Sequence, residues 1–192
     1  MRQTIVYSHG FKSSSQSRKA TQLAQYLRTH FPQCEYACPD LHFQPVQALA
    51  QLEACCREVP AEALSIVGSS LGGFYAVVLA EKLGCRAVLL NPSIRPFETL
   101  SRYLGEQANI YTGEKFEFSA AHITELKSLY APHVTRPERY LLIAELGDEL
   151  LDHRKTSAYL DSAKQILIDG GDHELTSFPQ HIPALAKFCF SD

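Results

Sequence analysis

The sequence predicts an α/β fold in which helices cover both faces of a mostly parallel sheet of about six strands. Short runs that are almost continuously apolar, such as residues 63–67 and 86–90, recur along the chain. Segments with apolar residues at three- and four-residue spacing separate these runs, which is the spacing of amphipathic helices. Parallel neighbours need a helix-length connection, and strands buried on both faces are apolar throughout. The alternation therefore favours a three-layer α/β/α arrangement.

Proline or glycine marks several boundaries between the predicted elements. The first helix stops at Pro32, the second stops before Pro60, and Gly84 closes the third. In chain order we expect strand 3–8, helix 17–31, strand 34–38, helix 46–59, strand 63–67, helix 74–82, strand 86–90, helix 120–129, strand 140–144, helix 156–163, strand 165–168 and helix 182–190. The alternation breaks between residues 94 and 136, where we expect a short helical, lid-like insertion over the sheet edge and the site.

Length and composition bound the class of protein. A chain of 192 residues with 45% hydrophobic residues is expected to form one domain over residues 1–192. The formal net charge is -3 and no block of basic residues occurs, so nucleic acid is not an expected partner. No apolar stretch reaches about 18 residues, and a strand pattern begins close to Met1, so we expect no membrane span and a cytoplasmic location. The sequence leaves the oligomeric state open.

The six cysteines argue against both a disulfide framework and a metal site. They are scattered, form no C-x-x-C pair, and several lie inside apolar runs. This usage is typical of reduced, buried thiols. We therefore expect neither a metal nor another cofactor.

The strongest motif is Gly68-Ser69-Ser70-Leu71-Gly72, between a predicted strand and a predicted helix. A G-x-S-x-G sequence in this setting is typical of a nucleophile elbow, where a sharp turn presents a serine and the flanking positions cannot carry side chains. Only Ser70 has glycine two residues before and two residues after it. The sequence thus predicts Ser70 as a nucleophile.

A serine nucleophile needs a base and an acid, which in a parallel α/β sheet should follow the carboxyl ends of strands. His173 follows the last predicted strand and is the predicted base. Asp148 follows the preceding strand and is the predicted acid, because Ser, Asp, His is a known chain order for such triads. Asp152 is its competitor, although a helix N-cap explains that residue equally well, and Glu145 falls within the strand end. The other histidines divide into helical ones expected to face solvent, namely His30, His122, His153 and His181, and two weak loop candidates, His42 and His133.

Two backbone amides are candidates for an oxyanion hole. The N–H of Leu71 lies at the start of the elbow helix, where unpaired amides favour negative charge. The N–H of Phe11 lies in the loop after the first strand, and Gly10 lets that loop approach the nucleophile closely. His9 is then interpreted as a residue that orients this loop rather than as the base.

These features resemble the α/β-hydrolase fold and, within it, the small bacterial esterases of the YqiA/YcfP type. The resemblance runs nearly end to end and rests on His9-Gly10-Phe11-Lys12-Ser13-Ser14, Gly68-Ser69-Ser70-Leu71-Gly72-Gly73-Phe74-Tyr75-Ala76, Asn91-Pro92-Ser93, Gly147-Asp148-Glu149-Leu150-Leu151-Asp152 and Gly170-Asp172-His173. It implies Ser70 as nucleophile, Asp148 as acid and His173 as base. It also implies that the first two strands of larger members are missing.

The predicted function is hydrolysis of a small acyl ester or acyl thioester through a Ser-His-Asp triad and an acyl-enzyme. Acyl transfer or peptidase activity on the same triad remains open, as does a catalytically silent scaffold that acts as a binding module. Aromatic residues of the 94–136 insertion, together with Phe11 and Phe43, either line an acyl pocket or form the insertion's own small core. Lys12, Arg18 and Lys19 either meet a phosphorylated thioester carrier or are solvated surface residues, the latter being favoured.

Overall fold

The computed structural model describes residues 2–191 and contains a central sheet in which every neighbouring pair of strands is parallel. Within the described residues its six strands are arranged in the order β2-β1-β3-β4-β7-β8. The strands are β1 (Thr4–Ser8), β2 (Glu35–Ala37), β3 (Leu64–Ser69), β4 (Arg86–Leu90), β7 (Tyr140–Glu145) and β8 (Lys164–Ile168). Two further strands, β5 (Gly105–Ala108) and β6 (Lys115–Phe118), form a separate antiparallel hairpin. The α/β class and the parallel sheet are confirmed.

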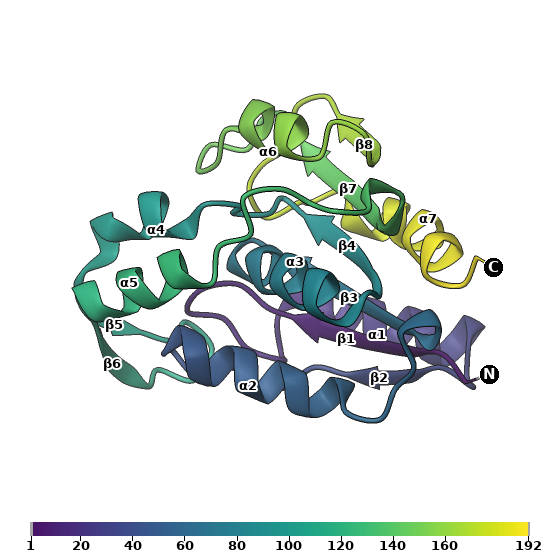
Figure 1. The fold of residues 1–192 in the computed structure, drawn as a ribbon, viewed down its shortest axis with the longest axis horizontal. Helices are drawn as coiled ribbons and strands as arrows, with labels where there is room; N and C mark the ends of the chain where they lie inside the picture. The colour runs from purple at the N-terminus through teal and green to yellow at the C-terminus, as the bar shows by residue number, and fades with distance from the viewer. Residues whose placement is uncertain (1, 192) are drawn as a thin grey trace.

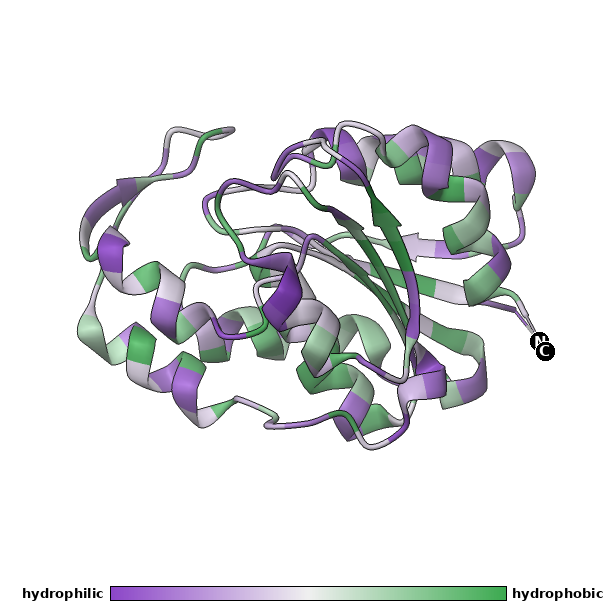
Figure 2. Cartoon of the chain, turned by 90° about the horizontal axis from the view of Figure 1, so that it is seen from above, coloured by the Kyte–Doolittle hydropathy of each residue, from purple (hydrophilic) through white to green (hydrophobic). Residues whose placement is uncertain are grey.

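Helices cover both faces of the sheet, as Figure 1 shows. They are α1 (Arg18–His30), α2 (Pro45–Cys56), α3 (Leu71–Leu83), α4 (Pro96–Thr99), α5 (Ala120–Ser128), α6 (His153–Tyr159) and α7 (Phe178–Cys189), with 3₁₀ turns at Ala61–Ala63, Leu100–Tyr103 and Pro137–Arg139. Side chains of α1 and α7 pack in one hydrophobic cluster, and those of α2 and α3 pack in the other. Figure 2 shows the strongly hydrophobic strands between these two helical layers.

Alternation along each strand divides the core between the two layers. In β1, Val6 packs toward α2 and α3, whereas Ile5 and Tyr7 pack toward α1 and α7. All three side chains are fully buried. Successive side chains of a strand point to opposite faces, so a strand covered on both sides has to be apolar at every position. The apolar runs of the sequence therefore have a direct physical cause.

Most predicted boundaries agree with the structure to within a few residues, and the largest differences, of four residues, lie at the end of α6 and the start of α7. The elbow helix α3 begins at Leu71 rather than at residue 74, and α7 begins at Phe178 rather than at residue 182. The start of α7 was missed because Pro179 lies in its first turn and Pro183 within the helix, and proline usually indicates that a helix is absent. Proline is tolerated in the first turn of a helix, where its missing N–H leaves no hydrogen bond unmade.

The insertion at 94–136 lies at the carboxyl ends of the strands, as Figure 1 shows. The predicted helix is present as α5, while the β5–β6 hairpin was not predicted. Its strands have only four residues each, which is too short for their alternation to be recognised. The hairpin and α5 together place the insertion beside the end of the sheet where the candidate site lies.

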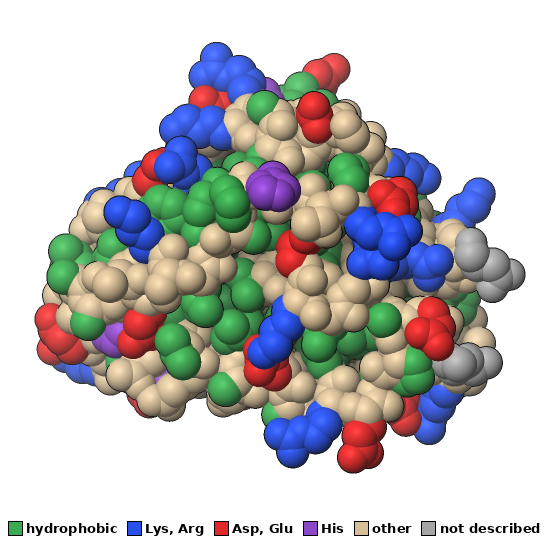
Figure 3. All heavy atoms as spheres, viewed as in Figure 1, with side chains coloured by type: hydrophobic (Ala, Val, Ile, Leu, Met, Phe, Trp, Pro, Cys, Tyr) green, Lys and Arg blue, Asp and Glu red, His purple; other side chains and the backbone are tan. Residues whose placement is uncertain are grey.

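The face seen in Figure 3 carries hydrophobic side chains between α3 and α5, where the insertion meets the body of the fold. Lys and Arg side chains are interspersed with Asp and Glu over the same face. Within residues 2–191, no helix combines the length and the hydropathy needed to cross a bilayer. The six cysteines, all of which lie in this described part, are free thiols.

Candidate active site

Ser70 occupies a strained turn between β3 and α3. Its backbone has φ 53° and ψ -120°, a conformation that L residues with a side chain rarely adopt. A Cβ atom on Gly68 would lie 2.2 Å from the Gly72 carbonyl oxygen, and one on Gly72 would lie 1.9 Å from the Ser8 carbonyl oxygen. Both glycines are therefore required by close packing of backbone on backbone. The turn has the geometry of a nucleophile elbow.

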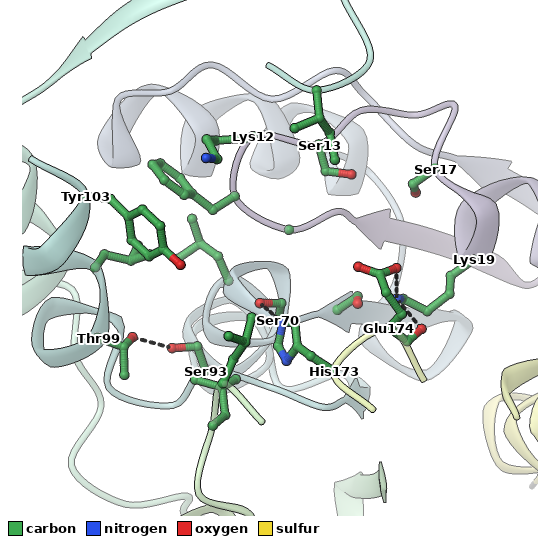
Figure 4. Close-up of a pocket in the computed structure, with 18 of the residues that line it drawn as sticks. Lys12, Ser13, Ser17, Lys19, Ser70, Ser93, Thr99, Tyr103, His173 and Glu174 are labelled. Carbon is green, nitrogen blue, oxygen red and sulfur yellow. Dashed lines mark hydrogen bonds and ion pairs between the residues drawn. The ribbon is translucent and has the colours of Figure 1, made fainter. Parts of the chain in front are cut away.

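The structure brings Ser70, His173 and Asp148 into one chain of hydrogen bonds. The Nε2 atom of His173 lies 3.0 Å from Ser70 Oγ, and its Nδ1 atom lies 2.8 Å from Asp148 Oδ2. The Asp148 side chain is 3% exposed and the His173 side chain 13% exposed. Figure 4 shows Ser70 and His173 facing each other among the residues that line a pocket. The geometry suits proton transfer from Ser70 to His173, with Asp148 holding the imidazole.

Asp148, rather than either rival, holds the histidine because the loop after β7 fixes its carboxylate. The backbone N–H groups of Leu150 and Leu151 both donate to Asp148 Oδ1, each at 2.9 Å, which leaves Oδ2 for His173. Asp152 is the N-cap of α6 and accepts from Arg154 N at 3.0 Å, the alternative that the sequence already offered. Glu145 is the last residue of β7.

Glu145 has a role that the sequence did not reveal, because it clamps the loop that carries His173. Its buried carboxylate accepts from Asp172 N at 2.7 Å and from Ser177 N at 2.9 Å, and also from the Ser177 hydroxyl. Burial raises the pKa of Glu145, but these hydrogen bonds outweigh burial and hold the pKa below its ordinary value. The ionised carboxylate thus fixes both sides of the loop between β8 and α7.

Asn91 ties the same loop to the middle of the sheet. Its side-chain amide donates to the carbonyl oxygens of Asp172 at 2.9 Å and His173 at 3.2 Å, and its Oδ1 accepts from Glu145 N at 2.9 Å. Asn91 is buried and has φ 39°. The sequence marked Asn91-Pro92-Ser93 only as part of a resemblance. A polar residue directly after a buried strand was the available signal.

The loop after β1 brings the two predicted oxyanion donors to the nucleophile. A Cβ on Gly10 would lie 3.4 Å from Ser70 Cβ, and Gly10, Phe11, Ser70 and Leu71 all line one cavity. Among residues 2–191, the backbone N–H groups of Phe11 and Leu71 have no hydrogen-bond acceptor. Two unpaired amides beside a serine hydroxyl are what stabilisation of an oxyanion requires.

His9 makes no hydrogen bond to Ser70, His173 or Asp148 and holds instead the loop of residues 9–13, which we call the oxyanion loop after its predicted role. Leu41 N donates to its Nε2 at 3.0 Å, so Nδ1 carries the proton and donates to the Gly10 carbonyl oxygen at 3.0 Å. Burial lowers the pKa of His9, which favours this neutral form. Through these two hydrogen bonds, His9 links Gly10 to Leu41.

The hairpin of the insertion also holds the oxyanion loop, which the sequence did not predict. Ile110 N donates to the Lys12 carbonyl oxygen at 2.9 Å, and Asn109 Nδ2 donates to the Ser13 carbonyl oxygen at 2.8 Å. Lys12 Nζ in turn donates to Gln107 Oε1 at 3.2 Å. The Phe11 ring packs against aromatic rings of the insertion, namely Tyr103, Phe116 and Phe118. The insertion therefore continues the wall of the site.

A cavity of about 220 Å³ opens beside Ser70. Leu100 and Tyr103 of the insertion line one end, and Ser17 and Lys19 at the start of α1 line the other. The sequence left open whether the insertion's aromatic residues line a pocket or form a small core of their own. Both occur, because Tyr103 lines the cavity while the Phe97 and Tyr130 rings pack together. Lys19 is only 8% exposed, so it is not the solvated surface residue that the sequence favoured.

The remaining histidines stay outside this arrangement. His122 is buried, contrary to the expectation that it faces solvent, because its Nδ1 accepts from Ser119 N at 2.9 Å in a capping box at the start of α5. His42 Nδ1 accepts from Gln44 N in its own loop. In the described part of the chain, no three His, Cys, Asp or Glu side chains are grouped closely enough to hold a metal ion.

Comparison with known proteins places these observations in a family. The family model described as "Uncharacterised protein family (UPF0227)" matches residues 4–190. A UPF0227 protein from Vibrio campbellii is 25% identical over 187 residues, which cover 96% of this chain and 98% of that protein.

Solved structures share the fold. Mouse alpha/beta hydrolase domain-containing protein 10 aligns with a TM-score of 0.71 at 14% identity, over 96% of this chain and 88% of that one. The esterase domain of a Rhodothermus marinus protein aligns with a TM-score of 0.68 at 20% identity, over 97% of this chain and 85% of that one. These likenesses establish the α/β-hydrolase fold.

Proposed function

The chain belongs to the UPF0227 family, as its resemblance to the YqiA/YcfP-type proteins indicated, and we propose that this member is a serine hydrolase of carboxylic esters or thioesters. One observation carries the proposal: a strained serine donates into a hydrogen-bonded His-Asp pair beside two unpaired backbone amides, all facing one cavity. An esterase domain among the similar folds supports the same reaction class. The reaction needs no group besides the protein's own residues and water.

In the acylation step, Ser70 Oγ attacks the carbonyl carbon of the substrate while His173 Nε2 takes the hydroxyl proton. The carbonyl oxygen becomes an oxyanion, which accepts hydrogen bonds from the N–H groups of Phe11 and Leu71. Asp148 accepts the Nδ1–H hydrogen bond and stabilises the imidazolium. The bond to the leaving oxygen or sulfur then breaks, and His173 gives its proton to that atom.

Water releases the acid in the second step. His173 takes a proton from the water as the water oxygen attacks the acyl-enzyme carbonyl carbon. The same two amides stabilise the second oxyanion. When it collapses, the Ser70 ester bond breaks and His173 returns the proton to Ser70 Oγ. A chain in which another acceptor replaces water at this step would be an acyltransferase.

A fluorophosphonate probe, followed by mass spectrometry of the labelled peptide, tests the proposal. We expect one adduct on Ser70 and a loss of ester turnover by about four or more orders of magnitude in Ser70→Ala. Ser69→Ala is the matched control, since Ser69 neighbours the nucleophile without the flanking glycines, and the adduct should persist on Ser70. A correctly folded protein without an adduct on Ser70 would instead be a catalytically silent scaffold.

A further inference from the structure

The cavity beside Ser70 has two chemically different ends. Leu100 and Tyr103 give one end an apolar and aromatic wall. The other end, which we call the α1 end, is lined by Tyr7, Ser17, Arg18 and Lys19. Figure 4 shows Ser17 and Lys19 on the same side of Ser70 as His173, and Tyr103 on the opposite side.

Two buried hydroxyl groups of the α1 end have no partner. Tyr7 is fully buried and Ser17 is 8% exposed, and within the described residues neither hydroxyl makes a hydrogen bond. Burial raises the pKa of Tyr7; the nearby Ser69 side chain opposes this shift only partly, so the phenol keeps its proton and is a donor. Leaving a buried donor unpaired costs about 1–3 kcal/mol. Two such groups on one cavity wall indicate a missing acceptor.

The start of α1 adds further donors at the same place. Ser17 is the N-cap residue, but its hydroxyl caps no helix amide. The first backbone hydrogen bond into the helix runs from Thr21 N to Ser17 O, so among residues 2–191 the amides of Arg18, Lys19 and Ala20 have no acceptor. Unpaired amides at a helix start favour negative charge.

The charged side chains on the cavity wall are mostly cationic, although the chain has a net charge of -3. Within the described residues, Arg18 and Lys19 lie at the α1 end with the single carboxylate of Glu174, whereas Lys12 and Arg102 lie over the Tyr103 ring, 5.3 and 5.1 Å from its centroid. Lys19 Nζ donates to the Glu174 carbonyl oxygen at 2.8 Å and lies 3.5 Å from its carboxylate Oε2. The Glu174 side chain is 70% exposed, so its carboxylate can turn into solvent when another anion binds beside Lys19.

We propose that the α1 end is a subsite for an anionic group, a carboxylate or a phosphate, on the leaving alcohol or thiol of the substrate. Tyr7, Ser17 and Lys19 are its ligands, and this inference rests on the proposed hydrolase function. The side of the cavity follows from the chemistry, because His173 protonates the leaving atom and the leaving group must therefore lie on the His173 side of Ser70. The acyl group then occupies the aromatic end.

Matched aryl esters test the subsite. Three phenyl butanoates would carry a para CH2–COO⁻, CH2–PO3²⁻ or neutral CH2–CONH2 group, where the methylene keeps the phenols similarly acidic. We expect kcat/KM for one or both anionic esters to exceed that of the neutral ester by about tenfold or more. A preference for one anion alone identifies it as the ligand. Equal values for all three esters would mean that the α1 end holds solvent only, and would overturn the proposal.

Substitutions locate the effect. Tyr7→Phe and Ser17→Ala should each lower the anionic values about tenfold and leave the neutral value within about twofold. Ser8→Ala is the matched control, because Ser8 is also buried and unpartnered but lies outside the cavity wall, and it should change neither value. Glu174→Gln should act in the opposite direction and raise the anionic values. An anion preference that survives both hydroxyl deletions would place the ligand elsewhere and contradict the proposal.

Folding and function are separated by two readouts. Both hydroxyls are unpaired in the free protein, so their removal should leave the thermal midpoint unchanged or raise it. If Tyr7→Phe fails to fold, Ser17→Ala still tests the subsite. Turnover of the neutral ester and its loss in Ser70→Ala report on the hydrolase function alone, so a failed subsite and a failed hydrolase give different results.

Discussion

Two regions meet at Ser70, the carboxyl edge of the sheet and the 94–136 insertion, and they differ in how firmly their residues are held. The carboxyl edge of the sheet carries Ser70, Asp148 and His173 on short turns held by buried polar groups and by glycines in backbone contact. The 94–136 insertion carries short elements, and the tip of its hairpin exposes Ile110 (71%) and Tyr111 (45%). The first region holds reacting groups at fixed distances, and the second supplies a wall. Substitutions of the reacting groups at the edge should therefore abolish chemistry, whereas those in the insertion should modulate it.

The sharpest test of the edge is Asp148→Asn, which we expect to lower kcat by about four orders of magnitude. The amide can donate to His173 Nδ1 and so favours the wrong imidazole tautomer, while the shape of the side chain is kept. Steady-state turnover of a short-chain aryl ester measures the loss. Asp152→Asn is the matched control, since it weakens only the α6 cap, and we expect nearly normal turnover. A large loss in Asp152→Asn with normal Asp148→Asn would transfer the role to Asp152.

A smaller effect at the same edge is expected from Glu145→Gln. The neutral amide replaces charge-assisted hydrogen bonds to Asp172 N and Ser177 N, and should lower the free energy of unfolding by about 2 kcal/mol and kcat by about tenfold. Because the Glu145 pKa is lowered in the folded state, its contribution to stability is present above the ordinary value of 4.5 and is lost as the pH falls below it. In urea unfolding between pH 3.5 and 6, the free energies of unfolding of the two proteins should therefore converge as the pH approaches 3.5.

The same contrast explains what the sequence could predict. The strands, the elbow and the order of Ser70, Asp148 and His173 are predictable because parallel strands have to be apolar throughout and functional groups collect at their carboxyl ends. Glu145 and Asn91 escaped prediction because their partners are backbone groups from distant loops, which no local pattern records. The hairpin escaped because its strands have only four residues each, and its contact with the oxyanion loop escaped because Asn109 and Ser13 are 96 residues apart in sequence.

The insertion is tested by Asn109→Ala combined with Gln107→Ala, which removes the two side-chain hydrogen bonds between the hairpin and the oxyanion loop. A loop that is held less firmly presents the Phe11 amide less often, so kcat should fall about three- to tenfold with little change in KM. Thr112→Ala is the control, because Thr112 accepts only from Glu114 N within the hairpin tip. A loss of kcat as large as that of Asp148→Asn would show that the insertion is as essential as the carboxyl edge, and would contradict the difference proposed between the two regions.

The smallest expected effect concerns His9, which holds the oxyanion loop against Leu41. Burial lowers its pKa below the ordinary value of 6.5, so the unfolded chain binds a proton more readily than the folded one. Stability from the neutral imidazole is thus complete above about pH 6.5 and is lost as the pH falls below that value, by at most about 1.4 kcal/mol per pH unit.

His9→Gln isolates this contribution from that of the other histidines. A glutamine can accept from Leu41 N and donate to the Gly10 carbonyl oxygen without titrating, so the free energy of unfolding of the variant should depend less steeply on pH between 5 and 6.5. Urea unfolding of both proteins at several pH values measures the difference in slope. Identical slopes would mean that His9 binds protons equally in the folded and unfolded chains, and that its burial does not favour the neutral imidazole.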